Sequence, residues 1–304
     1  QGVRGRHTPA LMKRMDETTF TYESPTDGLT IQARIWTGDP EPRAIVQLAH
    51  GMGEHSDRYA RFAEALTNAG YAVYAADHRG HGRTAGDASH HGDLGEGGWA
   101  ALVDDVRELG ARARAAHPGK KHALIGHSMG SFATQQLLLD HSGDVDAVVL
   151  SGSTAVDIVA AQLDPDAETD LSAFNAPFEH RTGYEWLSRD EAEVDKYVAD
   201  PACGFGLNPA GTRGMIEGAM LTGDADRLTN VRSDLPILIV SGDQDPLAAG
   251  GELIRLLETR YRAAGVHEVE VILYPEARHE ILNETNRDEV TADIIAFLDR
   301  AVGA

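Results

Sequence analysis

The residues with the clearest chemical signature are Gly-His-Ser-Met-Gly at positions 126–130, with Ser128 at the centre. An apolar run (residues 123–125) precedes them and a helix-like segment (residues 132–139) follows. A strand, a sharp turn and a helix in this order are typical of a nucleophilic serine whose backbone is strained and whose hydroxyl is exposed. Glycines suit this turn because a β-carbon would collide with the strand or the helix. The alternative is a glycine-rich turn with an inert serine. The presence of a base and an acid elsewhere in the chain distinguishes the two interpretations.

A serine hydroxyl needs a general base within hydrogen-bond reach, and the base needs an acid that orients it. Both are predicted in loops that follow strands, in the chain order serine, acid, histidine. The chain has 14 histidines, and only His279 comes just after the last apolar run. Asp243 and Asp245 follow the preceding apolar run and compete for the role of the acid. We therefore expect Ser128, His279 and one of these aspartates to form a catalytic triad.

Acyl transfer also requires hydrogen-bond donors for the oxyanion that forms on the substrate. The N–H of Met129 lies at the start of the helix that follows Ser128, where the helix dipole favours negative charge. A second turn, His-Gly-Met-Gly-Glu-His at residues 50–55, follows a buried apolar run. Its small residues let a main-chain N–H face the site. We expect the N–H groups of Met52 and Met129 to form the oxyanion hole.

Apolar runs alternate with helix-like patterns along most of the chain, which indicates an α/β fold with a mostly parallel central sheet. The expected strands are residues 18–24, 30–36, 44–48, 71–75, 121–125, 145–150, 236–241 and 269–273. The main expected helices are residues 59–68, 99–116, 251–264 and 287–302. Between residues 153 and 232 only short helical patterns and prolines occur. The sequence predicts an N-terminal tail or cloning remnant (1–17), a first core part (18–152), a helical insertion (153–232) and a second core part (233–304).

The composition narrows the function classes. The chain has 304 residues, 42% hydrophobic and 25% charged, which is ordinary for a globular protein with a sizeable core. Its net charge of −21 argues against nucleic acid and anionic membrane surfaces as partners. No apolar run approaches the ~20 residues that cross a bilayer, and the N-terminus does not read as a secretory signal. The single cysteine, Cys203, excludes an internal disulfide and fits a packing role in a cytoplasmic protein.

Two further patterns have plainer explanations. Residues 80–85 match a Gly-x-Gly-x-x-Ala dinucleotide pattern, but a glycine-rich loop follows where that site needs a helix. The histidines at 78, 81, 90 and 91 lack the paired acidic or cysteine ligands of a metal site. We therefore expect neither a cofactor nor a metal.

Taken together, these segments resemble the monoacylglycerol lipase and lysophospholipase family of serine α/β-hydrolases. The resemblance runs from about residue 18 to the C-terminus. Its matching segments are HGMGEHS at 50–56 with Arg-Tyr at 58–59, DHRGHG at 77–82, GHSMG at 126–130, WLSRD at 186–190, GDQD at 242–245 and YPEARH at 274–279.

The resemblance implies an α/β-hydrolase fold with an inserted helical cap, and it places the acid three residues after Gly242, at Asp245. In the family the cap shapes the acyl pocket and in some members docks on membranes. The cap residues expected to line the pocket are Phe174, Phe178, Trp186, Leu207 and Met220. The cap lacks an apolar helix flanked by basic residues, so we expect no stable membrane insertion. Transient membrane contact and the oligomeric state stay open.

The expected function is hydrolysis of carboxylic esters through an acyl-enzyme intermediate, without a cofactor. The expected substrates are monoacylglycerols, lysophospholipids or small esters with short to medium acyl chains. The same triad would also serve an aminopeptidase, a thioesterase or an acyltransferase, and the many acidic residues of the cap would suit a substrate amine. A non-catalytic ligand-binding protein on this scaffold is a further alternative. A dehalogenase or epoxide hydrolase would need an aspartate where Ser128 stands.

Overall fold

The computed structural model describes residues 15–38 and 40–303, and its centre is one sheet of eight strands. The strand order is β1-β2-β4-β3-β5-β6-β7-β8. β1, β2 and β4 pair antiparallel, and all other neighbours are parallel. The strands are β1 (Asp16–Glu23), β2 (Thr30–Thr37), β3 (Ile45–Ala49), β4 (Ala72–Ala76), β5 (His122–His127), β6 (Ala147–Ser151), β7 (Ile237–Gly242) and β8 (Val269–Tyr274).

This architecture confirms the predicted α/β fold, and each strand lies within two residues of its predicted bounds. β6 starts two residues later than predicted, and a 3₁₀ turn at Ser142–Asp144 precedes it. The first 14 residues of the predicted tail lie outside the described residues, and β1 begins at Asp16, inside the segment assigned to that tail.

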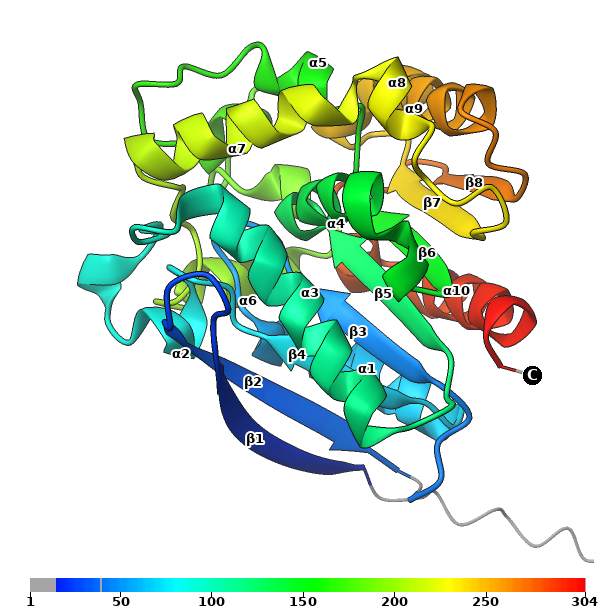
Figure 1. Ribbon diagram of the computed structural model, residues 1–304. Helices are drawn as coiled ribbons and strands as arrows, with labels where there is room; N and C mark the ends of the chain where they lie inside the picture. Colours follow the sequence, from blue (N-terminus) through cyan, green and yellow to red (C-terminus); the bar gives the residue numbers. More distant parts are fainter. Residues whose placement is uncertain (1–14, 39, 304) are drawn as a thin grey trace, which may run out of the picture.

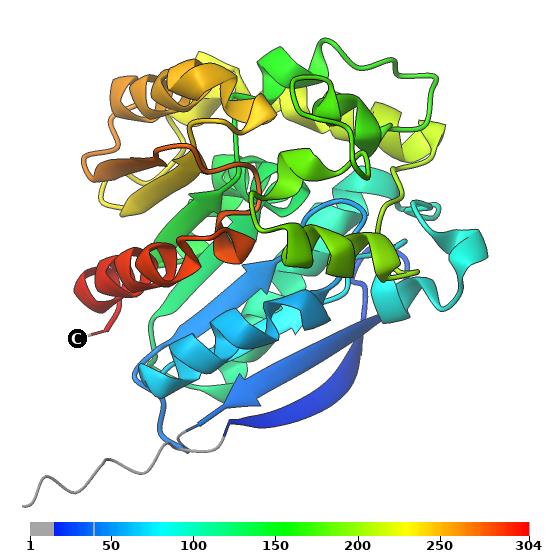
Figure 2. The same cartoon turned by 180° about the vertical axis from the view of Figure 1, so that it is seen from behind.

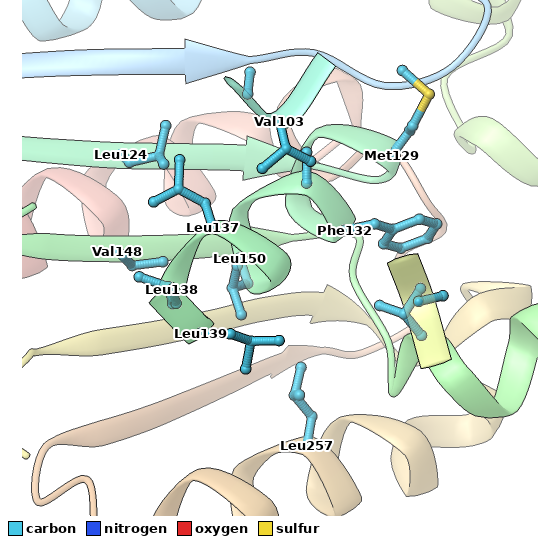
Figure 3. Close-up of a cluster of buried hydrophobic side chains, with 14 of the residues drawn as sticks. Val103, Leu124, Met129, Phe132, Leu137, Leu138, Leu139, Val148, Leu150 and Leu257 are labelled. Atoms are coloured by element: carbon cyan, nitrogen blue, oxygen red, sulfur yellow. The ribbon is translucent and has the colours of Figure 1, made fainter. Parts of the chain in front are cut away.

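Helices cover both faces of the sheet (Figures 1 and 2). On one face lie α3 (Gly98–Ala116), α4 (Met129–His141) and α9 (Glu252–Ala263), and on the other lie α1 (Ala60–Asn68) and α10 (Arg287–Ala301). Side chains of β5 alternate between the two cores, as a strand with both faces covered requires. Figure 3 shows Leu137 and Leu138 of α4 packed near Leu124 and Val148 of the sheet. This burial explains the long apolar run after Ser128.

The predicted insertion, residues 153–232, consists of helices and turns gathered at one end of the sheet (Figure 1). They are α5 (Val156–Ala160), α6 (Glu191–Ala199), α7 (Pro209–Thr222) and α8 (Ala225–Leu228), with 3₁₀ turns η4 (Leu171–Asn175) and η5 (Glu185–Leu187). α7 packs on α3, α4 and α5. Residues 153–232 are all described and contain no strand. The remaining short elements are α2 (Gly82–Ala85) and the 3₁₀ turns η1 (Ser56–Tyr59), η2 (Ala88–His90), η6 (Pro246–Gly251) and η7 (Ile281–Asn283).

The helices give no sign of a membrane-spanning segment. Within residues 15–38 and 40–303, no helix combines the length and the apolar character needed to cross a bilayer.

Candidate active site

Ser128 lies between β5 and α4 with φ 50° and ψ −121°, a conformation that residues other than glycine rarely adopt. Such a conformation costs about 1–3 kcal/mol and persists only where surrounding contacts hold it. Here Ser128 N donates to Ser151 O at 2.9 Å in β6, and Ser131 N donates to Ser128 O at 2.8 Å. A β-carbon on Gly126 would lie 2.6 Å from Gly130 O. The glycines of the Gly-x-Ser-x-Gly pattern are therefore required by close packing.

The loop at residues 50–55 packs directly against this turn. A β-carbon on Gly51 would lie 3.2 Å from Cβ of Ser128, so the loop backbone reaches the serine. Two hydrogen bonds fix the start of the loop: His78 N donates to His50 Nε2 at 3.0 Å, and Nε2 of His78 lies 3.1 Å from His50 O. These two hydrogen bonds therefore fix the start of the loop beside Ser128.

Met52 and Met129 line the same cavity as Ser128. Among the residues that the structure describes, neither of their backbone N–H groups is paired with a backbone acceptor. Met129 is the first residue of α4, so its N–H lies at the positive end of the helix dipole. Both groups are thus available for an oxygen atom of a substrate.

His279 follows β8 and is 2% exposed. Its Nδ1 lies 2.8 Å from Oδ2 of Asp245, which is 1% exposed and follows β7. Oδ1 of Asp245 accepts the N–H of Leu247 at 2.9 Å. Asp243 instead accepts the N–H of Glu276 at 2.8 Å. Asp245, rather than Asp243, is therefore the aspartate that contacts the imidazole of His279, and the contact is made through Nδ1.

Residues 184–205 contact two loops of the site, the one that carries His279 and the one that carries Met52. We call this segment the inner strip. Its Trp186 packs on His279 with ring centroids 4.7 Å apart and accepts the His279 N–H through its carbonyl at 3.2 Å. Leu187 O accepts the N–H of Glu280 at 2.7 Å. Nη1 of Arg278 donates to Glu185 O at 2.7 Å. The loop that carries His279 is thus bonded to the inner strip on both sides of the histidine.

The inner strip also holds the oxyanion loop. The Tyr197 hydroxyl donates to Gly53 O at 2.9 Å, and Gly204 N donates to the same carbonyl at 3.0 Å. Gly53 has φ +65°, and a β-carbon on it would meet the backbone of Phe205. Because Gly53 directly follows Met52, these contacts constrain one of the expected oxyanion donors.

The two histidines at the centre of the site have opposite pKa shifts. Burial opposes the charged form of His279, but the adjacent Asp245 carboxylate outweighs it and raises the pKa of His279 above its ordinary value. Burial, followed by the proximity of His279, lowers the pKa of His127 to about 3. The rings lie 4.9 Å apart. A neutral His127 therefore packs against a His279 that readily accepts a proton.

Ser128 and His279 line one pocket of about 580 Å³, part of which is open solvent. Most of its lining is apolar, and it continues into a smaller polar end that includes Glu54 and Glu280. The apolar lining residues are Met52, Met129, Phe132, Val159, Leu163, Leu171, Phe174, Trp186, Leu187, Met215 and Leu247. An apolar cavity with few polar groups suits an acyl chain that extends from the reacting carbonyl.

Of the five expected pocket residues, two line this cavity and three lie elsewhere. Phe174 and Trp186 line the cavity. Leu207 does not, because it is fully buried in the main core, and Met220 does not, because it lies on the outer side of α7 and is 51% exposed. Phe178 packs under the Arg278 guanidinium, whose carbon lies 4.6 Å from the ring centroid.

A buried charge cluster beside the site was not predicted. Arg58 donates to both oxygens of Glu280 at 2.6 and 2.8 Å and to Glu54 Oε2 at 2.8 Å. Burial opposes the charge of Glu280, but Arg58 lowers its pKa to about 2, whereas burial raises the pKa of Glu54. Oε1 of Glu54 is buried without a hydrogen bond. The spacing of Glu54 and Arg58, four residues apart, was the only signal in the sequence.

Comparisons with known proteins agree with this geometry. Residues 40–286 match the model of a protein family described as "Serine aminopeptidase, S33". The chain is 37% identical to a monoacylglycerol lipase of Mycolicibacterium smegmatis over 282 residues, which cover 89% of this chain and 95% of that protein. It is 26% identical to the monoglyceride lipase of Homo sapiens over 286 residues, 86% of each chain.

Solved structures show the same likeness. A thermostable carboxyl esterase from Bacillus coagulans, in complex with glycerol, superposes with a TM-score of 0.84 at 29% identity, covering 94% of this chain and 99% of that one. The family model and the relatives both extend over most of the chain. The chain therefore belongs to the "Serine aminopeptidase, S33" family of serine α/β-hydrolases, as a member that resembles monoacylglycerol lipases.

Proposed function

We propose that this protein hydrolyses carboxylic esters with Ser128 as nucleophile, His279 as general base and Asp245 as the orienting acid. One observation carries the proposal: Ser128 and His279 face one cavity, and Asp245 occupies the other ring nitrogen of His279. Two relatives are lipases and a structural neighbour is a carboxyl esterase, which supports ester chemistry. The N–H groups of Met52 and Met129 are assigned to the oxyanion hole.

The reaction follows from these assignments. Nε2 of His279 accepts the Ser128 proton as the hydroxyl attacks the ester carbonyl, and the two N–H groups stabilise the oxyanion. The imidazolium, stabilised by the buried Asp245, then protonates the leaving alcohol. A water molecule, deprotonated by His279, attacks the acyl-enzyme and releases the carboxylic acid. Every proton is carried by His279.

The cavity supports an acyl substrate. The proposed cap, residues 153–232, contributes Val159, Leu163, Phe174 and Met215 to the apolar end. Burying an acyl chain there contributes about 0.8 kcal/mol per methylene. We assign esters of short to medium acyl chains, with monoacylglycerols as the first class to test because two relatives carry that name.

An aminopeptidase is the second candidate, because the family description names that activity. The acids of the cap would have to face the cavity to hold a substrate amine. Among the described residues that line the cavity, none is one of the acidic residues proposed from the cap sequence, which are Asp164, Asp166, Glu168, Asp170, Glu179 and Glu185. Glu185 instead accepts the N–H groups of Thr182 and Gly183. The geometry thus favours the ester over the peptide.

The test compares p-nitrophenyl esters from acetate to palmitate, monoacylglycerols and an aminoacyl anilide. Wild type should hydrolyse esters, and Ser128→Ala should reduce kcat by at least about 10³-fold. Ser89→Ala, an exposed serine distant from the cavity, is the matched control and should retain full activity. Turnover of the anilide alone would replace the esterase with a peptidase. Equal activity of Ser128→Ala and wild type would refute the nucleophile.

A further inference from the structure

A separate group of side chains lies where the cap meets the core. His55 belongs to the loop after β3, and Asp200 and Cys203 belong to the loop after α6. One ligand atom of each residue lies within 4.8 Å of the other two. The His55 and Asp200 side chains are 14% and 30% exposed, and Cys203 is partly buried beside them, so solvent reaches the group from the side of Asp200 and His55. None of the three residues lines the catalytic cavity.

The donor set has a definite chemical preference. An imidazole nitrogen, a thiolate sulfur and a carboxylate oxygen are ligands that Zn²⁺ binds at about 2.0–2.3 Å in a tetrahedral arrangement. We infer that His55, Asp200 and Cys203 form a binding site for one divalent transition metal of the zinc class, with water as the fourth ligand. This inference does not depend on the proposed ester hydrolysis.

Small movements complete the site. Nε2 of His55 and Oδ2 of Asp200 are now hydrogen-bonded at 2.7 Å, which is closer than two ligands of one tetrahedral metal ion lie to each other. The metal would replace this hydrogen bond and enter between the two atoms. The Cys203 thiol would give up its proton to solvent as the sulfur binds. The thiolate and the Asp200 carboxylate together then balance the charge of the divalent ion.

A second cluster of possible ligands shows why this one is favoured. Glu54, His127 and Glu280 also lie within 4.8 Å of one another and are buried. The Arg58 guanidinium already donates to both carboxylates there, so its positive charge already balances the charge that would attract a metal ion. Arg58 also lies near enough to Cys203 to act on it electrostatically, but its printed side-chain hydrogen bonds go to Glu54 and Glu280 and not to His55, Asp200 or Cys203.

Metal binding at this junction would join the cap to the oxyanion loop. His55 lies two residues after Gly53, and Cys203 precedes Gly204, whose N–H bonds Gly53 O. The Asp200 loop follows Tyr197, which bonds the same carbonyl. A metal that binds the folded chain more tightly than the unfolded chain raises the melting temperature. We therefore expect Zn²⁺ to stabilise the protein against heat.

The experiment titrates chelator-treated protein with Zn²⁺ by calorimetry and records the absorption spectrum with Co²⁺. One metal per chain and a thiolate-to-cobalt charge-transfer band are expected. Removing a residue that only hydrogen-bonds to a metal ligand weakens metal binding by about 10–100-fold. Cys203→Ser and His55→Gln remove proposed ligands themselves, so each should weaken binding by more than about 100-fold. His90→Gln is the matched control, because His90 also pairs with an aspartate, Asp87, at an exposed site.

The outcomes separate clearly. Loss of binding in Cys203→Ser and His55→Gln, with His90→Gln unchanged, supports the site. Binding that persists in Cys203→Ser, or that disappears in His90→Gln, overturns it. Absence of the charge-transfer band in wild type also overturns it without any variant. Equal melting temperatures of metal-free wild type and metal-free variants show that the variants are folded.

Discussion

The insertion contains two regions that contact the active site in different ways. The inner strip, residues 184–205, makes polar contacts: it hydrogen-bonds the backbone of His279 and of Gly53. The outer region, α5 to η4 together with α7, contributes only apolar side chains to the cavity apart from Thr169. Trp186, Leu187 and Tyr197 of the inner strip also line the cavity, but only this strip bonds the backbone of the loops that carry His279 and Met52. Under the proposed function, the inner strip would position these loops and the outer region would select the acyl chain. Changes in the first should alter kcat, and changes in the second should alter acyl-chain preference.

The largest expected loss of kcat comes from changing Asp245, because this change misplaces His279. Asp245→Asn removes the charge that orients the imidazole and should reduce kcat by about 10⁴-fold, the scale known for the equivalent change in a serine protease triad. Asp243→Asn is the control, because its carboxylate bonds only backbone and side-chain amides beside the site, and it should change kcat by less than about threefold. Steady-state kinetics on one ester measures both. A larger loss in Asp243→Asn would reassign the acid.

The pH profile tests the electrostatics of the same histidine. Because Asp245 raises the pKa of His279, the acid limb of the kcat/KM profile should be centred above pH 6.5. On the acid side of that limb, kcat/KM should fall about tenfold for each pH unit. The sign follows from the need for a neutral base: protonation of His279 removes activity. His127, with a pKa of about 3, should not contribute between pH 5 and 8. An acid limb centred below 6.5 would contradict the assignment.

The residues proposed as the triad could be picked out from the sequence because each follows a strand and carries a local pattern. Ser128 is marked by glycines that the close packing of β5 and α4 requires, and His279 is marked by its place after β8. The contacts of the inner strip were not predictable. Tyr197 and Gly53 are separated by 144 residues, and nothing in either segment indicates the other.

The pocket residues show a second limit of the sequence. Apolar character alone does not say which way a cap side chain points. Met215 and Met220 both lie on α7, but five residues turn a helix by about 140°, so one lines the cavity and the other faces solvent. Leu207 is apolar because it belongs to the core under the cap. Only the packing of α7 on α3 and α4 distinguishes these cases.

The inner strip can be tested by removing one oxygen atom. Tyr197→Phe deletes the hydrogen bond to Gly53 O, and a neutral hydrogen bond contributes about 1 kcal/mol, so kcat should fall about fivefold while KM stays unchanged. Tyr184→Phe removes a hydroxyl of the same strip that donates to Gly204 O and not to Gly53 O, and it should leave kcat within about twofold. Equal losses in both variants would show general weakening of the cap rather than positioning of the oxyanion loop.

The smallest expected effect concerns the outer region and is visible only as a change in the preferred acyl-chain length. Val159→Phe places a larger side chain in the apolar cavity and should shift the best substrate towards shorter acyl chains. Each methylene that is no longer buried reduces kcat/KM by up to about fourfold, since its burial contributes about 0.8 kcal/mol. Ile158→Phe, an adjacent residue that is 37% exposed, is the control and should leave the chain-length profile unchanged.

Acetate turnover should be equal in all three proteins, because an acetyl group does not extend along the cavity. Loss of acetate turnover in Val159→Phe alone would show that the outer region also positions the catalytic loops, and the division of the cap into two roles would be wrong.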